Sequence, residues 1–245
     1  MTVKLIKKPE EQDPPKQVHL AIGCPMYDGR VALPFFSSIV NFVMEISKKH
    51  NVDFHFCTGE SILPKARNII VHQMLANKET THLLFVDSDI GFDGRDIDLM
   101  IQADKPIMIA PVQLKIPNKE IFNIDVIKTE KAQTRYTPFK VKRGGTGLML
   151  IQREVFEKLK PHVQTYTSVN MSTKKEEKQY AFFNYDVNGV DFTGEDYYFC
   201  NAWTKLGGEI WCAPWVKYQH ISNFHVYDKM YPVEVEESNN FDRNI

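Results

Sequence analysis

The sequence predicts an α/β fold in one large domain, with a mixed central sheet flanked by helices. Strand-like apolar runs alternate with helical segments through the first half of the chain, as in βαβ units. Beyond residue 120 short strand candidates follow one another, which is typical of an antiparallel or mixed extension. A chain of 245 residues with 43% hydrophobic content can bury the core that such a sheet needs.

The first half contains four expected strands and three expected helices. The first strand should end at Cys24-Pro25, because a residue before proline is pushed into extended conformation. The first helix has apolar residues at near-helical spacing, which should face the core: Phe36, Ile39, Val40, Val43 and Ile46. Pro64 suits the first turn of the second helix. We expect strands at 18–25, 52–59, 81–89 and 105–112, and helices at 33–49, 63–78 and 94–103.

The second half has shorter elements. Strand candidates lie at 121–128, 134–142 and 146–152, and the polar stretch 167–179 reads as a mobile loop. A helix at 194–208 should end at Gly207-Gly208, and a last strand follows within 209–225. We therefore expect one domain over 17–230, divided into a nucleotide-binding-like half (17–115) and a half with substrate-specific additions (116–230). Residues 1–16 and 231–245 should form flexible tails.

Composition indicates which binding partners and which cellular compartment to expect for this protein. Thirty basic and thirty-one acidic residues leave a formal charge of -1, so no overall field attracts nucleic acid or an anionic membrane. The four cysteines have no metal-knuckle spacing and read as reduced core thiols of an intracellular protein. No signal-peptide pattern and no apolar run of ~20 residues occurs. We expect a soluble, cytoplasmic protein that meets a membrane only through a partner or substrate.

The run "LLFVDSDIGF" ends a buried strand with two aspartates. Asp87 and Asp89 point to the same side if the strand geometry continues through Ser88, and the carboxyl end of a parallel strand is where open α/β sheets bind ligands. Two carboxylates there suit Mg²⁺ or Mn²⁺, which would neutralise a diphosphate. The same pair could instead cap the following turn or simply enter solvent.

Five segments in order resemble the GT-A glycosyltransferases of the family-2-like type. "HLLFVDSDIGF" is similar to the DxD strand, and "CPMYDGR" to the first nucleotide-contacting loop. "LPKARNIIVHQML" resembles the "ARN" helix, "GGTGLMLIQREVFEKL" the acceptor-side segment, and "TGEDYYFCNAW" the "ED" helix start. The resemblance covers about residues 18–220. It implies a Rossmann-like nucleotide-binding fold, with 17–115 holding the nucleotide sugar and 116–230 the acceptor.

The resemblance also implies roles for individual residues. Pro25, Tyr27 and Asp28 would surround the base and ribose, although "PMYD" departs from the usual "PxYN". Arg67 would face the phosphates, unless it is only a solvated helix residue. The remaining implied positions are the metal ligands Asp87, Asp89 and His220, with His225 as second choice for the histidine, the donor-side Ser88, the acceptor-side Gly145, Thr146 and Gly147, and the catalytic Glu195 and Asp196.

The implied activity is transfer of a sugar from a nucleotide-diphosphate donor, UDP-linked by preference, to a hydroxyl of a glycan or glycoconjugate. Mn²⁺ or Mg²⁺ and Arg67 would offset charge on the leaving diphosphate, and Asp196 would act as base in an inverting reaction. Glu195 would orient the acceptor. A retaining enzyme, a nucleotidyltransferase and a non-catalytic nucleotide-sugar-binding module stay open. So do structural roles: helix-dipole capping by the two acids, a satisfied structural His220, and tight turns at the glycines.

Overall fold

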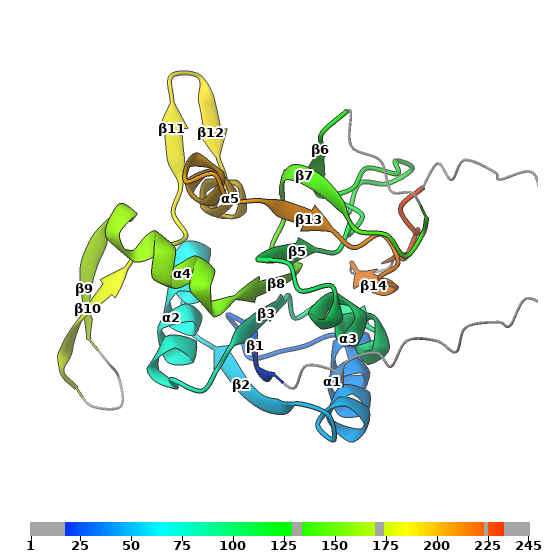
Figure 1. Cartoon of the computed structure of the whole chain (residues 1–245), viewed down its shortest axis with the longest axis horizontal. Helices are drawn as coiled ribbons and strands as arrows, with labels where there is room; N and C mark the ends of the chain where they lie inside the picture. Colours follow the sequence, from blue (N-terminus) through cyan, green and yellow to red (C-terminus); the bar gives the residue numbers. More distant parts are fainter. Residues whose placement is uncertain (1–17, 129–133, 170–173, 223–224, 233–245) are drawn as a thin grey trace, which may run out of the picture.

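The computed structural model describes residues 18–128, 134–169, 174–222 and 225–232 (Figure 1). The first half contains β1 (His19–Pro25), α1 (Leu33–Ile46), β2 (Asn51–Cys57), α2 (Leu63–Ala76), β3 (His82–Val86), β4 (Ile90–Phe92), α3 (Gly94–Gln102) and β5 (Ile107–Ile109). The second half contains β6 (Ile124–Val126), β7 (Phe139–Gly144), β8 (Leu148–Gln152), α4 (Arg153–Leu159), the 3₁₀ helix η1 (Lys160–His162), β9 (Thr165–Val169), β10 (Glu176–Tyr180), β11 (Asp186–Asn188), β12 (Asp191–Thr193), α5 (Glu195–Lys205), β13 (Ile210–Cys212), β14 (Tyr218–Ile221) and β15 (Val226–Tyr227).

An eight-stranded mixed sheet forms the centre of the molecule. Its strand order is β2-β1-β3-β8-β5-β13-β7-β6. β1 pairs in parallel with both β2 and β3, while β8 lies antiparallel between β3 and β5. The predicted α/β class, with a mixed central sheet flanked by helices, is confirmed. The division into two halves at residue 115 stays a prediction, and most of both proposed tails lies outside the described residues.

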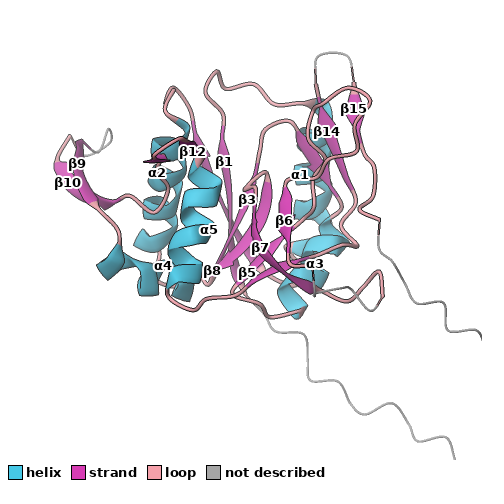
Figure 2. Ribbon diagram, turned by 90° about the horizontal axis from the view of Figure 1, so that it is seen from above, coloured by secondary structure: helices cyan, strands magenta, loops and turns pink. Residues whose placement is uncertain are grey.

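Helices cover both faces of this sheet. α2, α4 and α5 lie on one face, and α1 and α3 on the other (Figures 1 and 2). The fully buried strand β3 supplies alternate residues to the two cores: Leu83 and Phe85 to the first, Leu84 and Val86 to the second. β3 is therefore anchored in both cores, and its carboxyl end is a rigid place for a functional group.

Two expectations are wrong in detail. α1 buries Phe35, Ser38, Phe42 and Ile46. Three of the residues predicted to face the core are exposed instead: Phe36, Val40 and Val43. The helix is rotated because the Ser38 hydroxyl accepts a hydrogen bond from the Phe92 backbone N–H at 2.8 Å, and the Phe42 ring packs edge-on against Phe92.

The second correction concerns the stretch 167–179, predicted as a loop. It contains most of β9 and β10, which pair as an antiparallel hairpin beyond α2 and α4 (Figure 1). The hairpin is anchored to α2, because the Tyr180 backbone N–H donates to His72 Nε2 at 2.7 Å and the two rings stack.

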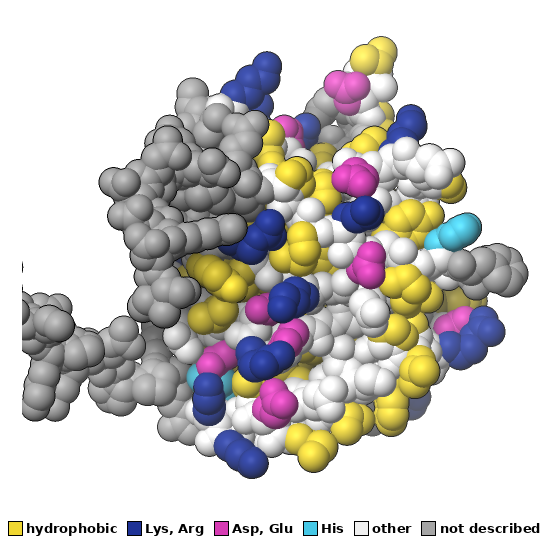
Figure 3. All heavy atoms as spheres, turned by 90° about the vertical axis from the view of Figure 1, so that its right-hand side faces the viewer, with side chains coloured by type: hydrophobic (Ala, Val, Ile, Leu, Met, Phe, Trp, Pro, Cys, Tyr) yellow, Lys and Arg dark blue, Asp and Glu magenta, His cyan; other side chains and the backbone are white. Residues whose placement is uncertain are grey.

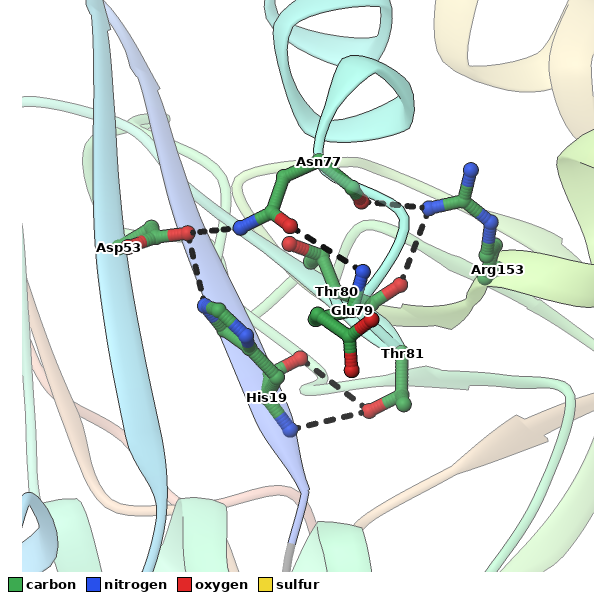
Figure 4. A network of polar contacts seen from close by, with 7 residues as sticks. All are labelled: His19, Asp53, Asn77, Glu79, Thr80, Thr81 and Arg153. Atoms are coloured by element: carbon green, nitrogen blue, oxygen red, sulfur yellow. Dashed lines mark hydrogen bonds and ion pairs between the residues drawn. The ribbon is translucent and has the colours of Figure 1, made fainter.

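At the sheet edge opposite the carboxyl end of β3, a polar network connects β1 and β2 to the end of α2 and to Arg153 (Figure 4). Asp53 accepts from Asn77 at 2.9 Å and lies 2.7 Å from His19 Nε2. Arg153 donates to the carbonyl oxygens of Leu75, Asn77 and Thr80 at 2.9, 2.9 and 3.1 Å. Arg153 thus satisfies carbonyls at the end of α2, which would otherwise lack partners.

The surface carries both charge signs. Figure 3 shows basic and acidic side chains interspersed over the face that holds α1, α3 and β14. The four cysteines are free and buried, as predicted: Cys24, Cys57, Cys200 and Cys212. Within the described part of the chain, no helix combines the length and apolar character needed to cross a bilayer.

Candidate functional site

Asp87 and Asp89 lie on a turn, not on a continued strand. β3 ends at Val86, and the Ile90 backbone N–H donates to the Asp87 carbonyl at 3.0 Å. The condition under which both side chains would share one side, an extended Ser88, is therefore not met. The two carboxylates contact different cationic partners.

Arg67 is the partner of Asp87 and the most buried charge of the site. It lies in the first half of α2, is 2% exposed, and donates from Nη2 to Asp87 Oδ1 at 3.0 Å. Its Nε donates to Glu195 Oε1 at 3.3 Å, and the guanidinium lies 5.2 Å from the Phe85 ring centroid. The solvated-helix interpretation of Arg67 is thus wrong. Its Nη1 is buried and has no hydrogen-bond partner.

Glu195 and Asp196 begin α5, as predicted. Glu195 is buried against Arg67, and both acids stand in the first helical turn, where the helix dipole favours negative charge. Burial, with a further contribution from the neighbouring charge of Glu195, raises the pKa of Asp196 above its usual range. A carboxyl with a raised pKa beside a helix start has the character of a general base.

Asp89 has a cationic partner that the sequence reasoning missed. Lys115, on the loop after β5, contacts Asp89 Oδ2. The other oxygen, Oδ1, is buried without a hydrogen-bond partner and lies 3.6 Å from His220 Nε2. His220 Nδ1 lies 2.8 Å from the Gln113 carbonyl, so Nδ1 carries a proton there. In the neutral tautomer, Nε2 and Asp89 Oδ1 are two acceptors that face each other, an arrangement that a shared cation would stabilise.

Glycines allow the predicted acceptor-side segment to approach Asp87 closely. The Asp87 backbone N–H donates to the Gly147 carbonyl at 3.0 Å, and a Cβ at Gly147 would stand 3.4 Å from Asp87 Oδ2. A Cβ at Gly145 would meet Asn123 Nδ2 at 2.7 Å, so a larger residue there would force the Asn123 side chain to shift. Thr146 between them is buried.

The predicted base-contacting residues lie on the loop after β1. Tyr27 is exposed, and its carbonyl accepts from the Gly59 backbone N–H of the loop after β2 at 2.9 Å. Asp28 forms an ion pair with Arg30, which lowers the pKa of Asp28. The Ser88 carbonyl accepts from the Ala32 N–H at 2.8 Å, which joins this loop to the aspartate turn. Pro25 ends β1 beside them.

Asn68 is a further residue that the motif reasoning passed over. Its side-chain amide both donates to the Phe183 carbonyl and accepts from the Phe183 N–H, each at 2.9 Å. It thereby attaches the segment before α5 to α2, next to Arg67. The quoted "ARN" triplet could have pointed to it, whereas nothing in the sequence pairs Lys115 with Asp89.

The site joins acids and cations from several elements at the carboxyl end of β3: Asp87, Asp89, Arg67, Glu195, Asp196, Lys115 and His220. Within the described residues, no three His, Cys, Asp or Glu side chains are arranged to hold a metal ion. The donor chemistry nevertheless fits a divalent cation at Asp89 and His220, because a buried carboxylate oxygen without a hydrogen-bond partner lies 3.6 Å from an imidazole nitrogen.

No protein-family model and no curated protein matches this sequence. Among solved structures, "A197 from STIV" is 15% identical with a TM-score of 0.55, over 91% of this chain and 100% of that chain. GalNAc-T7, crystallised with UDP, GalNAc and Mn²⁺, is 12% identical with a TM-score of 0.46, over 84% of this chain and 44% of that one. S. aureus TarS 1-349 is 12% identical with a TM-score of 0.42, over 85% of this chain and 59% of that one. The likeness to A197 establishes a shared fold.

Proposed function

We propose that this protein is a nucleotide-sugar-dependent glycosyltransferase of the GT-A type that uses a divalent cation. The main support is that Arg67 forms ion pairs with both Asp87 and Glu195 at the carboxyl end of β3, and that the three residues come from separate elements. Open α/β sheets bind ligands at this end of their strands. The ordered sequence resemblance to GT-A enzymes supports the donor class, with UDP preferred, and a glycan or glycoconjugate as acceptor.

Asp89 and His220 would hold the cation, with Asp87 next to them. Lys115 would then leave Asp89 Oδ2, since two cations do not share one carboxylate oxygen favourably. Mn²⁺ or Mg²⁺ in that place would act as a Lewis acid that offsets charge on the leaving diphosphate. Released from Asp89, Lys115 could contact the same phosphates as a mobile positive charge.

Arg67 provides a second, fixed positive charge. Its buried Nη1 has no protein acceptor, so a phosphate oxygen is a suitable partner. The Asp87 and Glu195 contacts hold the guanidinium in one orientation before any donor binds. Pro25, Tyr27, Asp28 and Ser88 would surround the base and ribose of the donor.

Asp196 would take the proton from the acceptor hydroxyl. Its raised pKa makes its ionised form a stronger base than an ordinary aspartate. Glu195, held by Arg67, would orient the acceptor, and the close-packed Gly145, Thr146 and Gly147 would allow a sugar to approach the backbone. These roles favour inversion, in which the acceptor oxygen gives its proton to Asp196 and forms a bond to the sugar's anomeric carbon while the bond to the diphosphate on the opposite side breaks. In a retaining enzyme, Asp196 would be dispensable for proton transfer.

The test is donor turnover together with thermal stabilisation by UDP, each with and without Mn²⁺. A bound ligand adds stability as RT ln(1 + [L]/Kd), so a melting shift reports binding even without an acceptor. Asp89→Asn should lose the Mn²⁺-dependent part of both signals. Asp93→Asn, a change of the same type at the α3 N-cap, should keep them, because asparagine also caps helices.

Three results would point elsewhere. Equal turnover by native protein and Asp89→Asn would remove the assigned cation site. UDP stabilisation without donor consumption, whatever the acceptor, would indicate a non-catalytic binding module. Release of pyrophosphate from a nucleoside triphosphate would indicate a nucleotidyltransferase.

A further inference from the structure

The β11–β12 hairpin, directly before α5, has an apolar face that turns to solvent. Val187 and Phe192 are directly opposite each other in the ladder, so they share a face. Tyr185, two residues before Val187, belongs to the same face, and its ring lies 5.3 Å from that of Phe192. The exposed fractions of Tyr185, Val187 and Phe192 are 42%, 65% and 68%.

Val190, at the tip of the hairpin, is a fourth exposed apolar residue, and the fold does not explain its exposure. Gly189 and Val190 form a two-residue turn, and the positive φ of Gly189 (65°) provides the conformation that such a turn requires. Turn geometry does not require a β-branched residue at the next position, yet Val190 is 99% exposed. An isolated two-stranded hairpin is only marginally stable in water, and contiguous exposed apolar residues are typical of interaction sites.

This face begins at the proposed catalytic centre. β12 ends at Thr193 and α5 begins at Glu195, so the base of the hairpin adjoins the helix start that holds Glu195 and Asp196. Burial raises the pKa of Tyr185, with a further contribution from the charge of Glu195. Tyr185 also lines a cavity of about 260 Å³ together with Ile62, Pro64 and Tyr166. The apolar face of the hairpin therefore begins at Tyr185, beside a cavity whose lining also includes the polar Asn68 next to Arg67, and it ends at the hairpin tip.

The opposite face of the hairpin narrows the choice of partner. It presents Asp186, Asp191 and Thr193, which alternate with the apolar residues along the two strands. Two carboxylates beside the apolar face disfavour insertion into an anionic bilayer, because the surface potential would repel them. A hydrocarbon group carried by a ligand of the site meets no such repulsion.

We infer that the β11–β12 hairpin binds the hydrocarbon part of the acceptor, so that the acceptor hydroxyl is carried on an alkyl or lipid group. This inference rests on the proposed transferase function and specifies its acceptor class. The hydroxyl would lie at Asp196, and the hydrocarbon would extend past Tyr185 along Val187 and Phe192 toward Val190. The distance from Tyr185 to Val190 is at most about 17 Å, from a rise of ~3.3 Å per residue, which suits a medium-length alkyl chain.

The experiment measures binding of methyl, hexyl and octyl β-glucosides to the full chain, below their micelle concentrations, by isotope-edited NMR of valine methyl groups. Native protein should bind more tightly as the alkyl chain lengthens, by about twofold to fourfold for each methylene that becomes buried. The shifts should centre on Val187 and Val190. Val190→Ser/Phe192→Ser should lose this dependence on chain length, and Val190→Leu/Phe192→Leu should retain it because the apolar area is kept.

A matched control is Val169→Ser/Leu206→Ser, which removes two exposed apolar residues outside the hairpin and should change nothing. Affinity independent of chain length, or an equal loss in the control, would overturn the inference. So would a native dimer that dissociates on Val190→Ser/Phe192→Ser, since a second copy would then cover the face. Stabilisation of the native chain by UDP and Mn²⁺ tests the transferase proposal separately. The transferase proposal and the acceptor inference can therefore fail independently.

Discussion

Replacing Arg67 by methionine should cost the protein a large part of its stability. The guanidinium is almost completely buried and pairs with two carboxylates, Asp87 at 3.0 Å and Glu195 at 3.3 Å. Methionine fills a similar volume, so the substitution tests charge and hydrogen bonding more than packing. It leaves Glu195, itself buried, without its cation.

The magnitude follows from the burial of the partners. Removing one member of a buried ion pair typically costs ~3–5 kcal/mol, because the remaining charge has neither water nor a counter-charge. The Asp87 side chain is about one-third exposed and can regain water, so most of the loss should come from Glu195. For a chain of this size, ~1 kcal/mol changes the melting temperature by about 2–4 °C, which gives a decrease of roughly 6–20 °C.

The assay is urea unfolding followed by circular dichroism, with a thermal melt alongside. Arg95→Met is the matched control: its ion pair with Asp93 is exposed, and exposed pairs contribute little. The double variant Arg67→Met/Glu195→Met should recover part of the loss, because it removes the stranded charge. If Arg67→Met were no less stable than Arg95→Met, Arg67 would not be a buried electrostatic centre, and the reasoning would be wrong.

Three further predictions concern the base, the cation site and the sheet edge. Asp196→Asn should lower donor turnover by ~10²–10⁴-fold. In the native protein, activity should fall as pH decreases through the pKa of Asp196, which lies above the ordinary 3.8, so the pH–rate profile should have its acid limb above that value. Because the folded pKa is raised, ionised Asp196 opposes folding, and the melting temperature of the native chain should fall relative to Asp196→Asn as pH rises through the same range. Lys115→Met should strengthen Mn²⁺ binding by about tenfold in a calorimetric titration, because it removes a competing cation from Asp89, and unchanged affinity would contradict that competition. Arg153→Met should cost ~2–4 kcal/mol in urea unfolding, since three carbonyls near the end of α2 lose charged donors; a loss below ~1 kcal/mol would show that water replaces the guanidinium.

Much of the fold could be predicted because its signals are local. Apolar runs with β character, helical spacing, and punctuation by Pro64 and Gly207 place most strands and helices near their observed bounds. The orientation of α1 could not be predicted, because Phe36 and Phe42 are equally apolar in the sequence. Only the hydrogen bond from the Phe92 backbone to Ser38 and the packing on Phe92 select the face that is buried.

In the site, too, the sequence predicts some features and only the tertiary structure decides others. The ordered sequence resemblance singles out Arg67, Asp87, Asp89, Glu195 and Asp196, whereas each carboxylate by itself also has a local explanation, such as capping a turn or a helix start.

Pairing is decided by tertiary structure alone. Arg67 meets a glutamate 128 positions away, and Lys115 meets Asp89 over 26 positions. Such long-range pairs depend on how the loops at one sheet edge are packed together, which no local pattern encodes. The chain by itself thus determined which chemical groups are available and on which elements they stand. The folded sheet decided which of them touch, because Coulomb and hydrogen-bond energies depend on distances of a few ångströms.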